Sequence, residues 1–426
     1  MRTGERSRGS AAATTAPAGP EQGLDAAAEI GGDDLLYLLG QRTPARPERS
    51  HSPPLRIVDL FAGCGGMTAG AVEGAKAIGR VGEIALAAEI DKAVRAVYRD
   101  NFPTANVHPQ GDVVELFPSA LGSRLSDGER MLAKSLGPIE LLVGGPPCQG
   151  HSNLNNHTRR RDPKNALYSR MVRAAEVLEP HMIVIENVPS VRRDRGDVVK
   201  CALERLVGLG YSVADGVVAM SQIGVPQRRF RHLLLATRTH VPSVDHLVAT
   251  HRRPERSLHW AIADLESVDP EQPFDMAARL SDENLARVRW LHKHDRYDLP
   301  NSKRPTCHRG KPDHRYKSMY GRMRYDQPAQ TITTGFGSPG QGRYLHPTRL
   351  RTLTPHEAAR VQFFPDSFTF GRAATRAALA HCIGNAVPPK LGYAIVRYLG
   401  SLVAGVELAI QPSDGTPSKS LAEAAE

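Results

Sequence analysis

A single cysteine, Cys148, stands in the loop sequence Gly-Gly-Pro-Pro-Cys-Gln at residues 144–149, directly after an apolar run at residues 139–143. The run predicts a buried strand. Proline fixes φ and removes a backbone donor, while glycine allows close approach, so we expect a stiff, non-helical loop. A thiol at the carboxyl end of such a strand is well placed to act as a nucleophile. An inert core thiol beside a turn remains the alternative for a lone cysteine.

An acid and two arginines follow the same rule of placement. Glu186 ends the apolar run at residues 182–185, and the sequence Gln-Arg-Arg-Phe-Arg at 227–231, with Arg229 and Arg231, leads into another apolar run. Because parallel strands end at one edge of a sheet, Glu186 is expected near Cys148. The alternatives are a capping or surface carboxylate for Glu186 and a solvated basic run for the arginines.

A third group of residues predicts a nucleoside-binding crevice. Glycines at 63, 65 and 66 follow the first strand and would let the backbone approach a ligand before a helix begins. Glu89 ends the next strand, where an acid can bind ribose hydroxyls. Asp112 falls in the loop after a further expected strand, where a carboxylate could meet an adenine amino group. Residue 68 is threonine, so the dinucleotide pattern G-x-G-x-x-G is absent and NAD is disfavoured.

The elements that must position these residues alternate between strand and helix, which predicts an α/β fold with a mostly parallel sheet. Strands are expected at 55–60, 83–90, 140–143, 182–185 and 232–236, and helices after residue 66 and at 91–101, 166–178, 197–209, 354–363 and 390–402. We predict a disordered tail at 1–53, a catalytic domain at 54–236 and 326–410, a basic and irregular target-recognition domain at 237–325, and a polar tail at 411–426.

Composition limits the classes of function. The 426 residues carry a formal net charge of +10, which fits an anionic partner such as nucleic acid. The five cysteines form no CxxC pair, so neither a zinc site nor a disulfide framework is indicated, and no metal is expected. No secretory signal or membrane span is evident, which predicts a soluble, cytoplasmic protein.

Six sequence blocks, in their order, resemble those of the bacterial DNA (cytosine-5)-methyltransferases. The resemblance implies a class I S-adenosylmethionine-dependent methyltransferase, Rossmann-like, with a smaller target-recognition domain. The blocks are 61–65 (Phe-Ala-Gly-Cys-Gly), 146–149 (Pro-Pro-Cys-Gln), 186–188 (Glu-Asn-Val), 227–231, 351–362 beginning Arg-Thr-Leu-Thr, and 384–388 (Gly-Asn-Ala-Val-Pro).

The resemblance implies the chemistry and its residues. Cys148 would add to carbon 6 of a cytosine flipped out of double-stranded DNA, and S-adenosylmethionine would methylate carbon 5. Glu186 would contact ring nitrogen 3 and the amine, Arg231 the carbonyl oxygen, and Arg229 would support the loop and the acid. The implied cofactor contacts are Phe61, Gly63, Gly65, Glu89, Ile90, Asp112, Pro147 and Asn385, and the implied DNA contacts in the loop after Cys148 are Ser152, Asn153, Arg159, Arg160 and Arg161.

Some alternatives stay open from the sequence. A branch of the family acts on tRNA, and a DNA-binding regulator with an inactive core would share the same blocks. A cysteine hydrolase would need a histidine base such as His151, but no orienting motif accompanies it. We expect a monomer associated with the nucleoid, and a companion restriction endonuclease is possible. The recognition sequence is not predicted.

Overall fold

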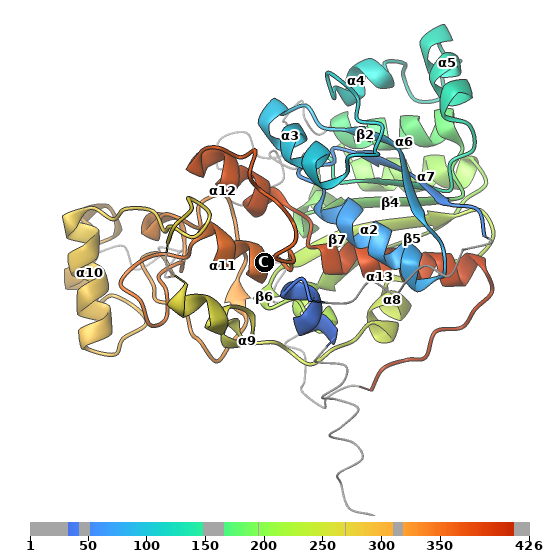
Figure 1. Ribbon diagram of the computed structural model, residues 1–426. Coiled ribbons are helices and arrows are strands. Elements are labelled where there is room, and N and C mark those ends of the chain that lie inside the picture. The colour runs from blue at the N-terminus through green and yellow to red at the C-terminus, as the bar shows by residue number, and fades with distance from the viewer. Residues whose placement is uncertain are drawn as a thin grey trace, which may run out of the picture.

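A six-stranded sheet, in the order β2-β1-β3-β4-β7-β5, forms the centre of the molecule in the computed structural model (Figure 1). The structure describes residues 33–41, 52–147, 166–194, 196–268, 270–309 and 318–412. The strands of this sheet are β1 (Leu55–Leu60), β2 (Gly82–Ala88), β3 (Leu141–Gly144), β4 (Met182–Asn187), β5 (Ser212–Ala219) and β7 (Phe230–Thr237). Strands β2, β1, β3 and β4 are parallel, and β7 runs antiparallel to both β4 and β5.

Both faces of the sheet are buried, because alternate residues of each strand enter different apolar clusters. Ile57 of β1 belongs to the cluster under α2 (Gly66–Ala77), α8 (Val244–Thr250) and α13 (Pro389–Val403). Val58 belongs to the opposite cluster, with α6 (Ala166–Leu178) and α7 (Val198–Gly208). A sheet covered on both sides needs nearly continuous apolar strands, which is the pattern that the sequence shows.

The predicted fold class is confirmed, with two differences in the sheet. The five expected strands are present with small shifts at their ends. Strand β5 was not predicted, because its sequence, Ser-Val-Ala-Asp-Gly-Val-Val-Ala, has an acid and a glycine at its centre. The strand expected before Asp112 is reduced to a single parallel bridge between Ala87 and Val107.

Helix starts follow local capping chemistry. Asp91 caps α3 (Lys92–Asn101) by accepting hydrogen bonds from the backbone amides of Ala93 and Val94. The predicted capping box of Thr354 and Glu357 is present at α11 (Pro355–Val361). The other helices are α4 (Val113–Leu116), α5 (Asp127–Leu136), α9 (Leu258–Ile262), α10 (Asp282–Lys293) and α12 (Arg376–Asn385). Within the described residues, none is both long and apolar enough to cross a membrane.

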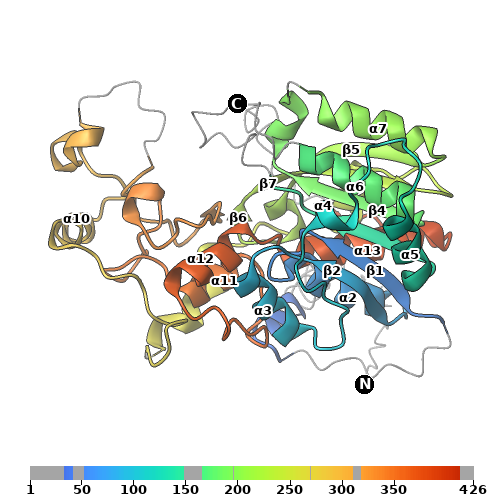
Figure 2. The same ribbon diagram turned by 90° about the horizontal axis from the view of Figure 1, so that it is seen from above.

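Helices α9 to α12 lie beside the sheet and form a second lobe, which we define as residues 257–385 (Figures 1 and 2). Its core is aromatic: Phe364, Phe368 and Phe370 are buried and in mutual ring contact. The two-stranded pair of β6 (Gln227–Arg228) and β8 (Ala329–Gln330) connects it to the remainder, the sheet lobe.

The lobe boundaries differ from the predicted domain boundaries. Helix α8, which lies beyond residue 237, packs on β5 and α13 of the sheet lobe. Helix α11, assigned from sequence to the catalytic domain, packs on α9 of the second lobe. Loss of aliphatic strand patterns therefore did not coincide with the change of lobe.

Part of the predicted N-terminal tail is folded, which corrects the prediction for residues 33–41. Residues 33–38 are helical, and Leu38 is 0% exposed in the apolar cluster under α13. The local sequence, two aspartates followed by Leu-Leu-Tyr-Leu-Leu and a glycine, combines acids at the first turn with a glycine at the end. These are start and stop signals of a short helix that the surrounding polar composition concealed.

Candidate active site

The carboxyl ends of β1, β3 and β4 meet at one edge of the sheet. Leu60 pairs with Gly144, and Gly144 with Ile185, so the loops after all three strands begin side by side. A Cβ on Gly144 would lie 2.6 Å from the carbonyl oxygen of Leu60 and 2.5 Å from Sδ of Met171. Glycine is required here because the backbone leaves the sheet through a space that no side chain can share.

The start of the cysteine loop lies against Glu186. A Cβ on Gly145 would be 3.1 Å from Oε2 of Glu186. The Nδ2 amide of Asn187 donates a hydrogen bond of 3.2 Å to the carbonyl oxygen of Pro146. The chain leading to Cys148 is thus fixed to the end of β4. Cys148 itself, together with Ser152, Asn153 and residues 159–161, lies outside the described residues.

Glu186 and Arg231 form a buried ion pair across β4 and β7. Nε of Arg231 lies 2.7 Å from Oε1 of Glu186, and both side chains are largely buried. This oxygen accepts no aligned hydrogen bond from the described residues. The pair therefore offers a carboxylate and a guanidinium side by side, and the carboxylate keeps capacity for a polar ligand.

Arg229 binds the backbone of two segments that are distant in sequence. Its guanidinium donates hydrogen bonds of 2.9 Å to the carbonyl oxygen of Ile332 and 3.0 Å to that of Ala386. Arg229 therefore fixes the strand pair of β6 and β8 to the segment that follows α12.

Glu89 joins the loops that follow β1 and β2, where the sequence predicts a nucleoside-binding crevice. Its Oε2 accepts a 2.9 Å hydrogen bond from the amide of Gly63, and its Oε1 a 2.8 Å bond from the amide of Asp91. Burial raises the pKa of Glu89 above its ordinary value, although those two amides act to lower it. Nothing lies within 4 Å of the position of a Cβ on Gly63, so the glycine loop faces open space.

Asp59 lies beneath this crevice on β1. Burial raises the pKa of Asp59 to about 7, although a hydrogen bond from the Thr68 hydroxyl opposes the shift and nearby Glu89 adds to it. Thr68 also contacts the hydroxyl of Tyr98 at 2.9 Å. Thr68, which served in the sequence analysis only to disfavour NAD, therefore ties the start of α2 to β1 and to α3.

The remaining predicted cofactor residues surround the same crevice. A Cβ on Gly111 would lie 1.8 Å from the carbonyl oxygen of Glu89, which brings the Asp112 loop against the end of β2. Asp112 caps α4 through a 2.8 Å hydrogen bond from the Val114 amide. Ile90 is 68% exposed, as expected of a residue that would cover a ligand. Phe61 has a positive φ of 57° at the loop start.

Residues 384–388 bring the distant C-terminal part of the chain to this loop. A Cβ on Gly66 would be 2.2 Å from the carbonyl oxygen of Val387, so the two segments are in backbone contact. The Cys64 thiol donates a 3.3 Å hydrogen bond to the carbonyl oxygen of Cys382. Asn385 is exposed beside the loop. Pro147, by contrast, is half-buried at the cysteine loop.

The sequence did not assign a role to Gln227, which joins these parts. Its Nε2 donates to the carbonyl oxygen of Val361 and to Oε1 of Gln362, while its Oε1 accepts from the Ile332 amide. It is 0% exposed. Its position at the start of the Gln-x-Arg-x-Arg block was the available signal. Among the described residues, no group of histidine, cysteine or acidic side chains could hold a metal ion.

Comparison with known proteins decides the family. The sequence pattern of the family "C-5 cytosine-specific DNA methylase" matches residues 55–401. This chain belongs to that family. It is 41% identical to the Type II methyltransferase M1.BsuMI of Bacillus subtilis, over 81% of this chain and 80% of that protein. It is 30% identical to the Type II methylase M.HgiDII of Herpetosiphon aurantiacus, over 82% of this chain and 96% of that protein.

Solved structures agree on the fold. A putative DNA modification methyltransferase from an Escherichia coli prophage superimposes with a TM-score of 0.57 at 23% identity, covering 82% of this chain and 99% of that one. The Dnmt2 methyltransferase of S. pombe superimposes with a TM-score of 0.55 at 16% identity and covers the same shares of the two chains. The methyltransferase described here is therefore a DNA (cytosine-5)-methyltransferase, with DNA as substrate and S-adenosylmethionine as methyl donor.

Proposed function

We propose that this enzyme methylates carbon 5 of a cytosine flipped out of duplex DNA, with Cys148 as nucleophile. The thiolate adds to carbon 6 and places the ring electrons on carbon 5. Carbon 5 then attacks the methyl carbon, and the bond from that carbon to the sulfonium breaks, so that the neutral thioether leaves. A base then removes the carbon 5 proton, and the thiolate leaves. The base is not assigned to any residue.

The pair of Glu186 and Arg231 supplies what the addition step needs. The glutamate would bind nitrogen 3 and the exocyclic amine, and the arginine the carbonyl oxygen, so charge that develops on the ring is stabilised as it forms. The observation that carries this proposal is the packing of Gly145 and Pro146 on Glu186 and Asn187. This packing brings the backbone leading to Cys148 within reach of a cytosine ring bound by Glu186 and Arg231.

The glycine loop and Glu89 would hold S-adenosylmethionine in the crevice at the ends of β1 and β2. Glu89, fixed by two backbone amides, keeps lone pairs for ribose hydroxyls. We assign Phe61, Gly65, Ile90, Asp112, Pro147 and Asn385 to the same site. The methyl donor supplies the electrophilic carbon, and the protein contributes orientation and exclusion of water.

We assign target recognition to residues 237–325, most of which lie in the second lobe, and to the loop after Cys148. Residues 237–325 would supply base contacts, and Ser152, Asn153 and Arg159–Arg161 would contact the substrate strand. The similarity to Type II methyltransferases favours a role in restriction-modification with a companion endonuclease. We further propose that the enzyme works as a monomer.

The proposal is tested with purified protein, tritiated S-adenosylmethionine, and either duplex DNA or tRNA. We expect label at cytosine carbon 5 in DNA, no label in tRNA, and none with Cys148→Ser. A duplex with 5-fluorocytosine should trap a covalent complex, because fluorine cannot leave carbon 5 as a cation in the way that the proton does. Cys201→Ser is the matched control, since Cys201 is exposed on α7. Trapping that depends on another cysteine, or methylation of tRNA alone, would contradict the proposal.

A further inference from the structure

The helical turn at residues 33–38 lies where the two lobes meet. Asp34 is buried and contacts two basic residues. Its Oδ1 accepts a 2.5 Å hydrogen bond from Nζ of Lys390, on α13 of the sheet lobe. Its Oδ2 accepts a 2.9 Å hydrogen bond from Nη2 of Arg256, which lies at the junction with the second lobe, one residue before the cap of α9. The Arg256 guanidinium lies 4.0 Å from the ring centroid of Trp260 in α9. One carboxylate therefore joins α13 to the segment that leads into α9.

Apolar and backbone contacts of the same turn reinforce this bridge on the side of the second lobe. The ring of Tyr37 stacks on Phe363 with centroids 5.8 Å apart. The carbonyl oxygen of Leu38 accepts a 2.8 Å hydrogen bond from the amide of Asp366. Phe363 and Asp366 both follow α11, so the turn grips the second lobe at two further points.

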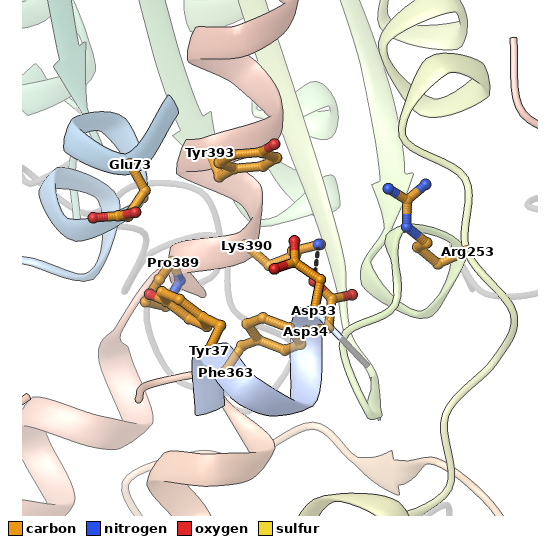
Figure 3. Close-up of a pocket in the computed structure, with 10 residues that line it drawn as sticks. Asp33, Asp34, Tyr37, Glu73, Arg253, Phe363, Pro389, Lys390 and Tyr393 are labelled. Atoms are coloured by element: carbon orange, nitrogen blue, oxygen red, sulfur yellow. Dashed lines mark hydrogen bonds and ion pairs between the residues drawn. The ribbon is translucent and has the colours of Figure 1, made fainter. Parts of the chain in front are cut away.

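The turn at residues 33–38 makes a few polar and ring contacts with its surroundings and does not fill the space beside α13. A cavity of about 250 Å³ remains beneath the turn, lined by Lys390, Arg253, Glu73 and Tyr393 among others. Figure 3 shows Asp34 facing Lys390 inside this cavity, with Tyr37 beside Phe363. The buried ammonium of Lys390 depends on its counter-ion, since burial lowers the pKa of Lys390 and Asp34 opposes that shift.

We propose that residues 33–40 act as a clasp that fixes the orientation of the second lobe, and that Asp34 is a positioning residue for DNA. The proposal rests on the proposed function, because a duplex that engages both the Glu186–Arg231 pair and the second lobe must span the two lobes. Loss of the bridge would loosen that orientation without touching the reacting groups. The cost should fall on DNA binding, since the two lobes must then be ordered on the duplex.

The test compares Asp34→Asn with Asp34→Glu and with the control Glu73→Gln. The control removes a carboxylate that lines the same cavity but pairs with Lys76 on α2. For Asp34→Asn we expect the KM for DNA to rise roughly tenfold, with kcat and the Kd for S-adenosylmethionine within about twofold. Asp34→Glu should restore part of the loss, and Glu73→Gln should match the unaltered enzyme. An unchanged KM for DNA would overturn the clasp. A rise of the KM for DNA accompanied by an equal loss of kcat and an equal rise of the Kd for S-adenosylmethionine would also overturn it.

A second measurement keeps the two proposals separable. Amide hydrogen exchange in α9, without DNA, should be faster in Asp34→Asn than in Glu73→Gln, because α9 follows Arg256 directly. Equal exchange would also overturn the clasp. If Asp34→Asn does not fold, Arg256→Gln tests the same bridge from the other side. Failure of the unaltered enzyme to methylate DNA, with the exchange difference present, would instead contradict the proposed function.

Discussion

The carboxyl edge of the sheet and the second lobe of this methyltransferase use charged residues for different purposes. In the sheet lobe, apolar strands and a buried network of Arg173 with Glu129 and Glu176 supply stability, whereas the pair of Glu186 and Arg231 stands at the sheet edge beside the cysteine loop. In the second lobe, buried charge is part of the framework. Arg360 is 1% exposed and contacts both Asp264 and Asp366, and His356 lies between Asp275 and Asp366.

The difference teaches where substitutions should be felt. A regular sheet buries its backbone polar groups in its own ladder, so functional side chains can be removed without loss of the frame. A lobe of short helices and loops must satisfy backbone and side-chain groups with specific partners. Removal of a charge should therefore cost activity at the sheet edge, around Glu186, and stability in the second lobe.

The largest expected effect is on catalysis. Glu186→Gln keeps the shape but loses the negative charge and the ability to share a proton, so kcat should fall by roughly 10²- to 10⁴-fold. The free energy of unfolding should change by less than about 1 kcal/mol, because Arg231 keeps a polar partner. Single-turnover methylation and urea denaturation measure the two quantities. A large loss of stability at Glu186 would break the contrast between the lobes.

Arg360→Met examines the opposite case. It leaves two carboxylates without their buried guanidinium, and we expect a loss of about 3 kcal/mol, the low end for such pairs because both acids are partly hydrated. Arg372→Ala serves as the control, since Arg372 is exposed and pairs with Asp100 on the surface. That variant should stay within about 0.5 kcal/mol. Chemical denaturation of both proteins would settle the point.

Arg229 and Arg231 allow a structural and a functional arginine to be compared two residues apart in the sequence. Arg229→Met removes two charged hydrogen bonds to backbone between the lobes and should destabilise the fold by about 2 kcal/mol. Arg231→Gln, which keeps a hydrogen-bond donor beside Glu186, should cost less stability than Arg229→Met but raise the KM for DNA or lower kcat. Thermal unfolding and steady-state assays on both variants separate the roles. The same loss of stability in both would contradict our assignment.

The smallest expected effect is a dependence on pH in the second lobe. Burial lowers the pKa of His356, but hydrogen bonds and charge from Asp366 and Asp275 outweigh it and raise the pKa above 6.5. A raised pKa in the folded state stabilises the fold fully below the unfolded value and loses that contribution as pH rises through the folded value. The stability difference between the unaltered enzyme and His356→Gln should therefore shrink from pH 6 to pH 9. A constant difference would exclude titration of His356 as its source.

The sequence predicted an element correctly where a local pattern of residue types is sufficient to specify that element. Apolar runs located five strands, and the Thr354–Glu357 capping box located a helix start. Strand β5 escaped because Asp215 and Gly216 interrupt its pattern, yet Asp215 is satisfied there by His232 at 2.9 Å. That partner is distant in sequence and close only after folding, so no local pattern could signal it.

The candidate site was predictable in its residue types more than in its connections. The end of β4 placed Glu186, but its partner Arg231 depends on the antiparallel register of β7, in which Glu186 pairs with Leu233. The clasp was missed because Asp34 and Lys390 are 356 residues apart. Long-range ion pairs of this kind leave no periodic trace in the chain.

The contact between Gly66 and Val387 has a consequence for how the enzyme is made. The proposed cofactor crevice needs a loop from the start of the catalytic sequence and another from near its end, so it is incomplete on a growing chain. Contacts of such high sequence separation form late and slowly. Newly translated enzyme should therefore remain unable to bind its methyl donor until α13 has left the ribosome and docked on α2. Methylation then begins only after synthesis of the catalytic fold is finished.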